Sequence, residues 1–229
     1  SRTSSPLATM LSARGRCGEE STFTVAALRT VGIPARQVYT PRWAHTDDNH
    51  AWVEFWVDGT WHYLGACEPE PVPDRGWFTE PARRAMLVHT KAFGRYDGDE
   101  TVIRKDKLFS EINTLARYAV TKVLKVRVTG TDTVPIPGAS VAFMLYNYAE
   151  FYPLARLNCD SNGECSLMTG SGSLLIWADN GEKSGFTLAS PSDTLVTVVL
   201  LQSEPAAGTI NLDLYAPEVP EPFPGTDSA

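Results

Sequence analysis

Residues 15–20 read Gly-Arg-Cys-Gly-Glu-Glu, which places Cys17 in a turn bracketed by glycines, directly before an amphipathic segment. In that segment, Phe23, Ala26, Ala27 and Thr30 recur at helical spacing, so we predict a helix over Ser21–Thr30. The unpaired N–H groups and the positive dipole end at a helix N-terminus favour a thiolate over a thiol. Cys17 is therefore a candidate nucleophile, and the alternative is an inert cysteine with a packing role.

A second stretch, Asn-His-Ala-Trp-Val-Glu at residues 49–54, supplies a candidate base. His50 opens a segment in which small or aliphatic side chains alternate with larger ones, the period of a strand. A histidine fixed at a strand end can hold a thiol within hydrogen-bond reach. We interpret Cys17 and His50 as a nucleophile and its base.

Residues 6 to about 93 resemble the C-terminal half of the catalytic core of the transglutaminase-like superfamily, which includes transglutaminases, peptide N-glycanases and bacterial cysteine-protease-like relatives. The matching blocks occur in one order, at residues 15–19, 28–39, 49–54 and 61–68. The resemblance implies a Cys-His-Asp site on an α+β, papain-like core. In such a site the thiolate attacks an amide carbonyl and the imidazole handles the proton, roles that fall to Cys17 and His50.

The third member of the family site is replaced in this chain. The family aspartate usually lies four residues beyond a tryptophan, and Gly65 occupies that position after Trp61. Glu68 or Glu70 could reach back on a longer side chain, and we take Glu68 as the orienting group. Because such triads are recognised by geometry, three outcomes stay open: a substituted triad, a working Cys-His dyad, or a site kept only for binding.

The chain begins at Ser1 without an initiator methionine, and the family core normally has helical material before its cysteine. We therefore expect an upstream segment of the same protein, including helices beside the nucleophile helix and a side chain that assists the oxyanion hole. The backbone N–H of Cys17 would supply one oxyanion donor, a type of contact that contributes about 3 kcal/mol in known cases.

Composition narrows the function classes. The chain has 229 residues, of which 43% are hydrophobic and 21% charged, enough for one or two globular domains. A net charge of −7 without a basic stripe argues against nucleic acid as a partner. No apolar run reaches the ~18 residues of a membrane span. We expect no cofactor.

The sequence changes character near residue 118. We predict a transglutaminase-like domain over 1–118, a β-sandwich over 119–203 and an extended tail over 204–229. The linkage Asp106–Tyr118 reads as a short amphipathic helix, and Ile210–Leu214 as an added strand. Seven short strands indicate an antiparallel sandwich, at 122–128, 139–145, 152–158, 164–168, 173–178, 185–188 and 194–201.

The second domain also has a family resemblance. The sequence Val-Pro-Ile-Pro-Gly-Ala-Ser-Val at 134–141, followed by Asp-Ser-Asn-Gly at 160–163 and a further strand, resembles the carboxypeptidase regulatory-like, transthyretin-like modules. These modules are mostly accessory domains.

Cys159 and Cys165 flank a tight turn at 160–164 and could meet across adjacent strands. A disulfide there would imply an oxidising compartment, and two free thiols are the alternative. We expect an extracellular, periplasmic or cell-surface location. Residues 160–163 also resemble the opening of a calcium loop, but later ligands are missing, so a hairpin turn is favoured.

Cys67 lies close to the expected acid position, and we interpret it as a buried thiol beneath the site. A redox switch between Cys17 and Cys67 is an unsupported alternative. A zinc site could draw on Cys17, His45, His50, His62 and Cys67. Their spacings follow no short ligand pattern, so we predict no metal site.

Two tryptophans are candidate substrate-binding residues. Trp43 lies on the loop before the His50 strand, where a rigid scaffold presents binding side chains. Trp52 follows His50 on the strand, although most of the tryptophans are expected to be core residues. Asp47 and Asp48 read as a solvated turn, or as carboxylates that raise the pKa of His50 and favour an imidazolium–thiolate pair.

Together these features predict thiol-dependent chemistry on amide bonds of peptides, proteins or glycopeptides. Hydrolysis and transfer to an amine would share one acyl-enzyme and stay undecided. The alternative is a non-catalytic protein in which a degenerate core and the sandwich bind peptide or glycan.

Overall fold

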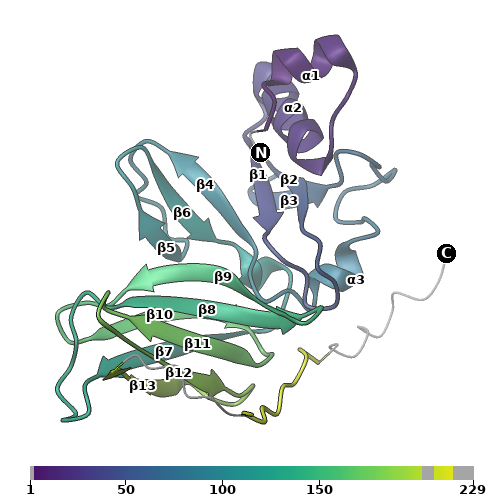
Figure 1. Ribbon diagram of the computed structural model, residues 1–229. Helices are drawn as coiled ribbons and strands as arrows, with labels where there is room; N and C mark the ends of the chain where they lie inside the picture. The colour runs from purple at the N-terminus through teal and green to yellow at the C-terminus, as the bar shows by residue number, and fades with distance from the viewer. Residues whose placement is uncertain (1–2, 203–208, 219–229) are drawn as a thin grey trace.

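The computed structural model of the chain describes residues 3–202 and 209–218 (Figure 1). Its elements are α1 (Pro6–Ser12), α2 (Cys17–Thr30), β1 (Ala35–Thr40), β2 (His50–Val57), β3 (Thr60–Leu64), α3 (Thr79–Ala82), β4 (His89–Phe93), β5 (Val102–Lys105), β6 (Phe109–Asn113), the 3₁₀ turn η1 (Leu115–Arg117), β7 (Thr121–Thr129), β8 (Ser140–Asn147), β9 (Glu150–Asn158), β10 (Glu164–Gly170), β11 (Leu174–Asp179), β12 (Lys183–Ala189), β13 (Leu195–Val199) and β14 (Leu201–Gln202). Below, residues 3–118 are called the N-terminal lobe and residues 119–202 the sandwich.

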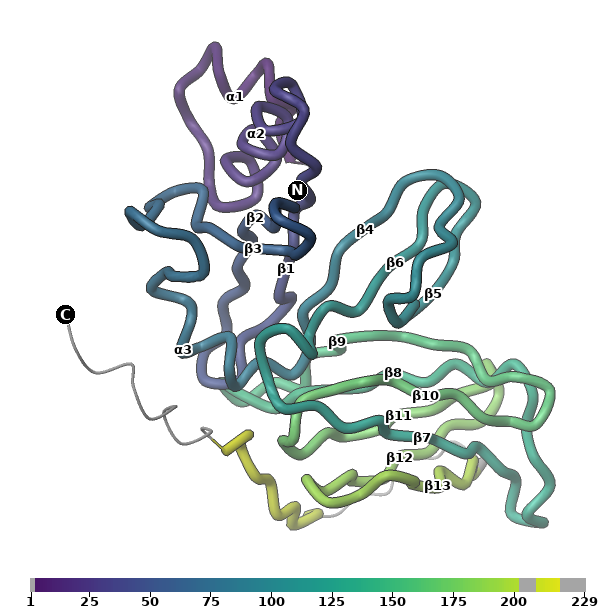
Figure 2. Tube along the Cα trace, turned by 180° about the vertical axis from the view of Figure 1, so that it is seen from behind, coloured from purple at the N-terminus to yellow at the C-terminus, as the bar shows by residue number. Residues whose placement is uncertain are grey.

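The N-terminal lobe is built on one six-stranded sheet in the order β3-β2-β1-β4-β6-β5. A two-residue turn joins β2 to β3, and both of its residues, Asp58 and Gly59, have positive φ. That conformation matches the twist of the paired strands. Figure 2 shows β4, β5 and β6 extending away from the other three strands, above β9 of the sandwich. The lobe is thus α+β, and the chain as a whole is mainly β.

Alternation along β1 and β2 gives the sheet two different faces. One face, with Ala35 and Val53, packs against Val25 and Leu28 of α2. The opposite face carries the aromatic cluster, whose buried members include Val38, Trp43, Trp52, Phe78 and Leu115. The helix and the aromatic cluster therefore lie on opposite sides of β2.

The predicted helix is confirmed, but it begins at Cys17 instead of Ser21. The earlier start is explained by Glu19, whose Oε2 accepts a hydrogen bond from the backbone N–H of Arg16 at 3.1 Å. The predicted helix over Asp106–Tyr118 is wrong, because its middle part, Phe109–Asn113, is strand β6 and only Leu115–Arg117 form a 3₁₀ turn. Pairing with β4 buries Ile112 and overrides the local helical pattern.

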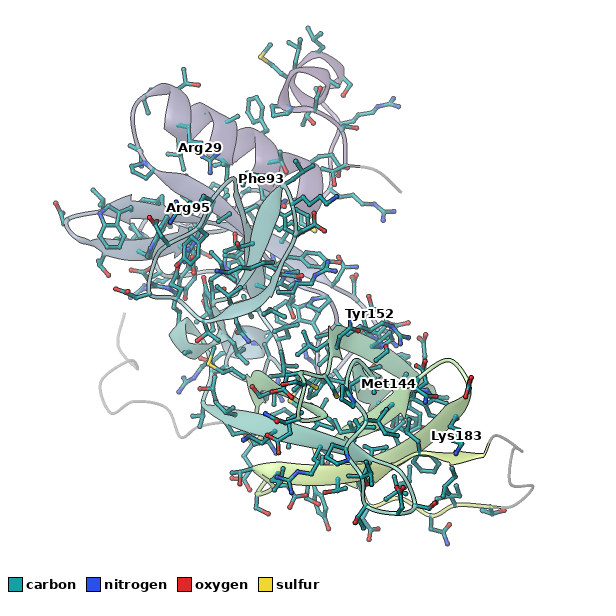
Figure 3. The ribbon with its side chains drawn as sticks, turned by 90° about the vertical axis from the view of Figure 1, so that its left-hand side faces the viewer. Arg29, Phe93, Arg95, Met144, Tyr152 and Lys183 are labelled. Carbon is teal, nitrogen blue, oxygen red and sulfur yellow. The ribbon has the colours of Figure 1, made fainter. Side chains whose placement is uncertain are left out.

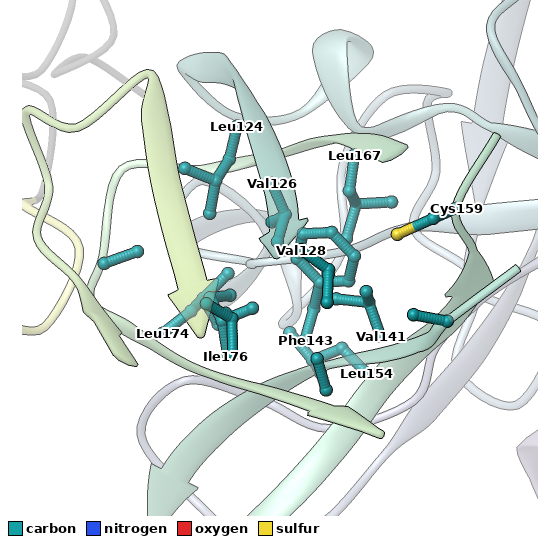
Figure 4. Packing of buried hydrophobic residues seen from close by; sticks show 14 of the residues in the cluster. Leu124, Val126, Val128, Val141, Phe143, Leu154, Cys159, Leu167, Leu174 and Ile176 are labelled. Atoms are coloured by element: carbon teal, nitrogen blue, oxygen red, sulfur yellow. The ribbon is translucent and has the colours of Figure 1, made fainter. Parts of the chain in front are cut away.

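The sandwich consists of a three-stranded sheet, β10-β7-β13, and a five-stranded sheet, β14-β12-β11-β8-β9. Figure 4 shows the aliphatic core between them, including Leu124 and Val126 of β7 and Val141 and Phe143 of β8. The seven predicted strands are confirmed. The antiparallel prediction fails at one pair, since β13 runs parallel to β7 after the chain crosses back from the other sheet. The transthyretin-like assignment stays a prediction.

The C-terminal segment was only partly predicted. Ile210–Leu214 do not form the expected strand. Instead, the backbone of Tyr215 forms two hydrogen bonds with Ser173, one through its carbonyl oxygen at 2.8 Å and one through its N–H at 3.0 Å. Most of the expected tail, 204–229, lies outside the described residues. Among the helices that the structure describes, none has the length and apolar character needed to cross a membrane.

Candidate active site

Cys17 is the first residue of α2, and its side chain is partly exposed. The first turn of the helix is fixed to the sheet by Gln37 of β1. The Gln37 Nε2 donates to the carbonyl oxygen of Gly18 at 2.9 Å and to the hydroxyl of Ser21 at 2.7 Å. The Cys17 thiol is therefore held at the N-terminus of α2, beside the backbone N–H groups of the first helical turn.

Tyr39 of β1 marks the place where three parts of the chain meet. Burial raises its pKa to about 12, and the nearby ionisable groups Tyr152, Cys17 and Asp48 act in the same direction. Those groups come from β9 of the sandwich, the start of α2 and the loop before β2. Electrostatic coupling to one phenol places all three within short range of it.

His50 opens β2 and is only 6% exposed. Its ring is enclosed by aromatic rings, with centroid distances of 4.7 Å to Trp77, 5.0 Å to Phe78, 5.8 Å to Trp52 and 6.2 Å to Trp43. Burial lowers the pKa of His50 from 6.5 to about 4, and the charge of Asp48 opposes this shift only partly. His50 is thus a neutral imidazole at physiological pH.

The expected imidazolium–thiolate pair is therefore wrong for the described conformation. Asp48 does act on His50 in the predicted direction, but desolvation outweighs it. In the described part of the chain, the buried Nε2 of His50 has no hydrogen-bond partner and no hydrogen bond joins His50 to Cys17. The His50 ring lies with Trp52 on the aromatic face, whereas α2 covers the opposite face.

The position of the family acid is filled by packing. A Cβ on Gly65 would lie 3.2 Å from the carbonyl oxygen of Glu68 and 3.3 Å from Cε1 of Phe78. A larger residue at 65 would require that ring to move. The carboxylate of Glu68 accepts a hydrogen bond from the indole N–H of Trp77. Glu68 therefore holds the tryptophan that covers His50, and its bond to the imidazole stays a prediction.

Trp77 is the site residue that sequence reasoning missed. Its side chain is 53% exposed, yet its ring is the aromatic ring nearest to His50 among the described contacts. It lies in the segment 65–78, which has no strand and is fixed at Asp74. The Asp74 carboxylate lies 2.6 Å from His62 Nδ1 and accepts a bond from the backbone N–H of Tyr63 at 2.9 Å. A tryptophan in a segment rich in proline and glycine, where a core strand is not expected, was the available signal in the sequence.

Trp43 and Trp52 are buried, at 2% and 0% exposure. Both belong to the wall that encloses His50, so neither presents its ring to solvent in this conformation. The indole N–H of Trp52 donates to the hydroxyl of Tyr118 at 2.9 Å, and that hydroxyl donates to Glu54 at 2.6 Å. Trp52 is thereby tied to a buried polar network. Their role in substrate binding stays a prediction.

The buried-thiol prediction for Cys67 is wrong, because the residue is exposed. Partial desolvation and the neighbouring carboxylate of Glu20 raise the pKa of Cys67 to about 12. Its thiol is therefore protonated at neutral pH and a poor competitor for Cys17. Zinc was only the alternative for Cys17, His45, His50, His62 and Cys67, and among the described residues no group of three His, Cys, Asp or Glu side chains is placed to hold a metal ion.

A cavity of about 410 Å³ runs beside α2, between β1 and β4. Its lining includes Tyr39, His89, Arg29 and Phe93, the last two of which are labelled in Figure 3. His89 Nδ1 lies 2.7 Å from Glu111, whose pKa is lowered to about 2 mainly by His89. Neither Cys17 nor His50 lines this cavity.

No curated protein sequence matches this chain. One similar solved structure, entitled "Structure of the Streptococcal ancillary pilin", is 9% identical, with a TM-score of 0.31 over 72% of this chain and 61% of that chain. This chain thus spans less than two thirds of the pilin's length.

A more local match covers the segment that holds both candidate residues. Within the N-terminal lobe, residues 1–78 match the family model of the Transglutaminase-like superfamily.

Proposed function

We propose that this chain performs thiol-dependent acyl transfer on amide bonds of peptides or glycopeptides, with Cys17 as the nucleophile. The observation that carries the proposal is the position of Cys17. It is a partly exposed thiol at the first residue of a 14-residue helix, inside the segment that matches the transglutaminase-like family. A thiol in that place has the electrostatic environment of a reactive cysteine.

In the proposed reaction the sulfur of Cys17 attacks the amide carbonyl and forms a thioester as the C–N bond breaks. The proton from the thiol passes to His50 and then to the departing amine, so the first half-reaction is balanced. Water or a second amine then attacks the thioester and regenerates the thiol. The neutral state of His50, with its pKa near 4, is the form that can accept a proton.

This chemistry requires a movement, because His50 lies behind Trp77 and Phe78. We propose that segment 65–78 moves as substrate binds and gives the imidazole access to the thiol. The segment is suited to this movement, because most of residues 67–77 are exposed. The bond between Glu68 and Trp77 and the contacts of Asp74 hold it in the described conformation. Hinged active-site loops of this kind are common.

A second function, binding of peptide or glycan without catalysis, is favoured by the enclosed imidazole. Its Nε2 has no partner in the described chain, Glu68 is engaged with Trp77, and Gly65 is packed against Phe78. In this second function Cys17 would have no catalytic role and would only reflect descent from an enzyme.

Alkylation with iodoacetamide distinguishes the two functions, and peptide mapping by mass spectrometry reads each cysteine separately. An unstructured peptide with one exposed cysteine is the reference thiol, because the pKa of Cys67, raised to about 12, would make even an ordinary thiol react fast by comparison. We expect Cys17 to react on the order of tenfold faster than the reference thiol. His50→Gln should leave this alkylation rate unchanged in the free chain, where the imidazole is enclosed, and should slow product formation on a peptide amide. A Cys17 rate no higher than that of the reference thiol, with no product formed, would support the binding function.

If Cys17 is reactive, its product on an amide-containing peptide distinguishes hydrolysis from transfer. Mass spectrometry of the peptide, in the presence of a small primary amine, reports a free acid for hydrolysis and an added amine for transfer. Cys17→Ser is the control, and product formation that survives this substitution would contradict the proposal.

A further inference from the structure

The hairpin between β8 and β9 of the sandwich reaches the loop that precedes His50. The hairpin turns at Tyr148 and Ala149, which both have positive φ, and Asn147 is the last residue of β8. Figure 3 shows Tyr152, four residues after Tyr148, on the side of the sandwich that faces the N-terminal lobe. The hairpin and loop 41–49 are therefore neighbours although about a hundred residues separate them.

The side-chain amide of Asn147 is fully used by this loop. Its Nδ2 donates to the carbonyl oxygens of Trp43 at 2.7 Å and Thr46 at 3.0 Å, and its Oδ1 accepts from Arg42 Nε at 2.7 Å. Three bonds from one planar group fix the loop in position and in orientation. The loop is also closed on itself, because Trp43 N–H donates to the carbonyl oxygen of Asp48 at 2.9 Å.

Arg42 strengthens the same connection from the other lobe. It is only 6% exposed, and its guanidinium donates to the carbonyl oxygen of Asp47 at 3.2 Å and to Glu150 of β9 at 3.2 Å. The guanidinium also lies over the ring of Tyr152, 5.1 Å from its centroid. A buried guanidinium needs partners for its charge and its donors, and here the loop and the hairpin share them.

We infer that Asn147 is a positioning residue for the site: it fixes loop 41–49, and through Trp43 it sets the enclosure of His50. This inference rests on the proposed function of His50, which follows the loop directly. It assigns the sandwich a part in organising the site, since one of its hairpins supplies the amide.

Other bonds also join the two lobes, and they provide the matched control. Thr169 is fully buried, and its hydroxyl donates to the carbonyl oxygen of Met86 at 2.8 Å without touching loop 41–49. Thr169→Val therefore removes an inter-lobe hydrogen bond of similar length while leaving the loop contacts of Asn147 in place. A purely structural role for Asn147 predicts the same behaviour from both sites.

The test is an NMR titration of the His50 ring in Asn147→Ala, Asn147→Ser and Thr169→Val, together with the Cys17 alkylation rate. In both Asn147 variants the loosened loop admits water around His50, and we expect its titration midpoint to rise by about one pH unit or more. The serine variant is decisive if the alanine variant does not fold. Thr169→Val should keep the midpoint near that of the unmodified chain.

The inference is overturned if the folded Asn147 variants titrate like the unmodified chain, or if Thr169→Val shifts His50 equally. The midpoint is measured without any substrate, so it is separate from the proposed catalysis. The Asn147 variants could shift the titration midpoint of His50 while His50→Gln leaves the rate of product formation by Cys17 unchanged. That result would support the positioning role and contradict the catalytic one.

Discussion

In the sandwich, the buried polar residues that the structure describes are Thr129, Thr169 and Ser173, which carry only hydroxyl groups. In the N-terminal lobe, the buried residues include Arg36, Arg42, His50 and Glu54. Buried ionisable groups require partners and add little net stability compared with apolar side chains. The difference indicates that the interior of the sandwich is an apolar packed core, whereas the interior of the N-terminal lobe also contains ionisable side chains.

Two of these buried groups, Arg36 and Glu54, belong to one connected network. Arg36 Nε lies 2.6 Å from Glu54, and its two terminal nitrogens contact Glu100 at 2.7 and 2.6 Å. Tyr118 links Glu54 to Trp52, the neighbour of His50 on its face of the sheet. A satisfied network of this kind holds β2 in one arrangement, and β2 is the strand that presents His50.

The largest effect should come from the sandwich core. Phe143→Ala removes a ring that is 0% exposed, and we expect the free energy of unfolding to fall by about 3–5 kcal/mol. Urea unfolding measures the loss, with Phe143→Leu as the milder control. A loss below about 1 kcal/mol would contradict the view that this interior is a tightly packed apolar core.

The next effect belongs to the N-terminal lobe and depends on pH. His50 has a pKa near 4 when folded and 6.5 ordinarily, so between these values the unfolded chain binds more protons. The free energy of unfolding should therefore fall as pH drops from about 6.5 to about 4, by at most about 3 kcal/mol. His50→Gln should reduce the slope of the free energy of unfolding against pH in this interval.

A distinct carboxylate serves as the control for that titration. Glu111 has its pKa lowered to about 2, so its contribution is present above its ordinary value of 4.5 and is lost as pH falls toward 2. Glu111→Gln should lower the free energy of unfolding by a constant amount above about pH 4.5, reduce its pH dependence between about 4.5 and 2, and leave the slope between pH 6.5 and 4.5 unchanged. An unaltered slope between pH 6.5 and 4 in His50→Gln would mean that the imidazole is not enclosed.

A smaller effect is expected from Glu54→Gln, which keeps the shape of the side chain but removes its charge. Its two short bonds, to Arg36 and Tyr118, are weakened, and we expect a loss of about 2 kcal/mol in urea unfolding. Glu164→Gln is the matched change on the sandwich surface, where the carboxylate contacts Arg127. Equal losses at the two sites would break the contrast between the lobes.

The smallest effect concerns the cysteines of the sandwich. Cys159 and Cys165 are free thiols, the second of the two alternatives that the sequence left open, and burial raises the pKa of each. A reducing agent should leave the melting temperature unchanged, whereas loss of a native disulfide would cost about 2–5 kcal/mol. A fall in melting temperature on reduction would show that a disulfide is present in the protein. The expected location outside the cytoplasm remains a prediction.

Local patterns predicted much of the fold. The helix at Cys17 and the seven sandwich strands follow from periodicity and turn residues, which act over a few neighbouring positions. The errors arose where distant strands decide the structure. Residues 109–113 lie in a segment with a helical pattern but pair with β4, and β13 lies parallel to β7 because the chain changes sheets. Neither partner is visible in the local sequence.

For the candidate site, the sequence by itself determined which chemical groups are available. It placed a cysteine at a helix start and a histidine at a strand start, since capping residues and alternation are local properties. It also placed Gly65 where the resemblance to transglutaminase-like proteins implies an acid.

Only the tertiary structure decided the state of those groups. The low pKa of His50 depends on its enclosure by Trp77 and Phe78, and the loop before His50 is held by Asn147; these three residues are distant from His50 in sequence. Desolvation is the sum of every neighbour around a group. A pKa near 4 in place of 6.5 therefore arises only when the chain has closed around the ring.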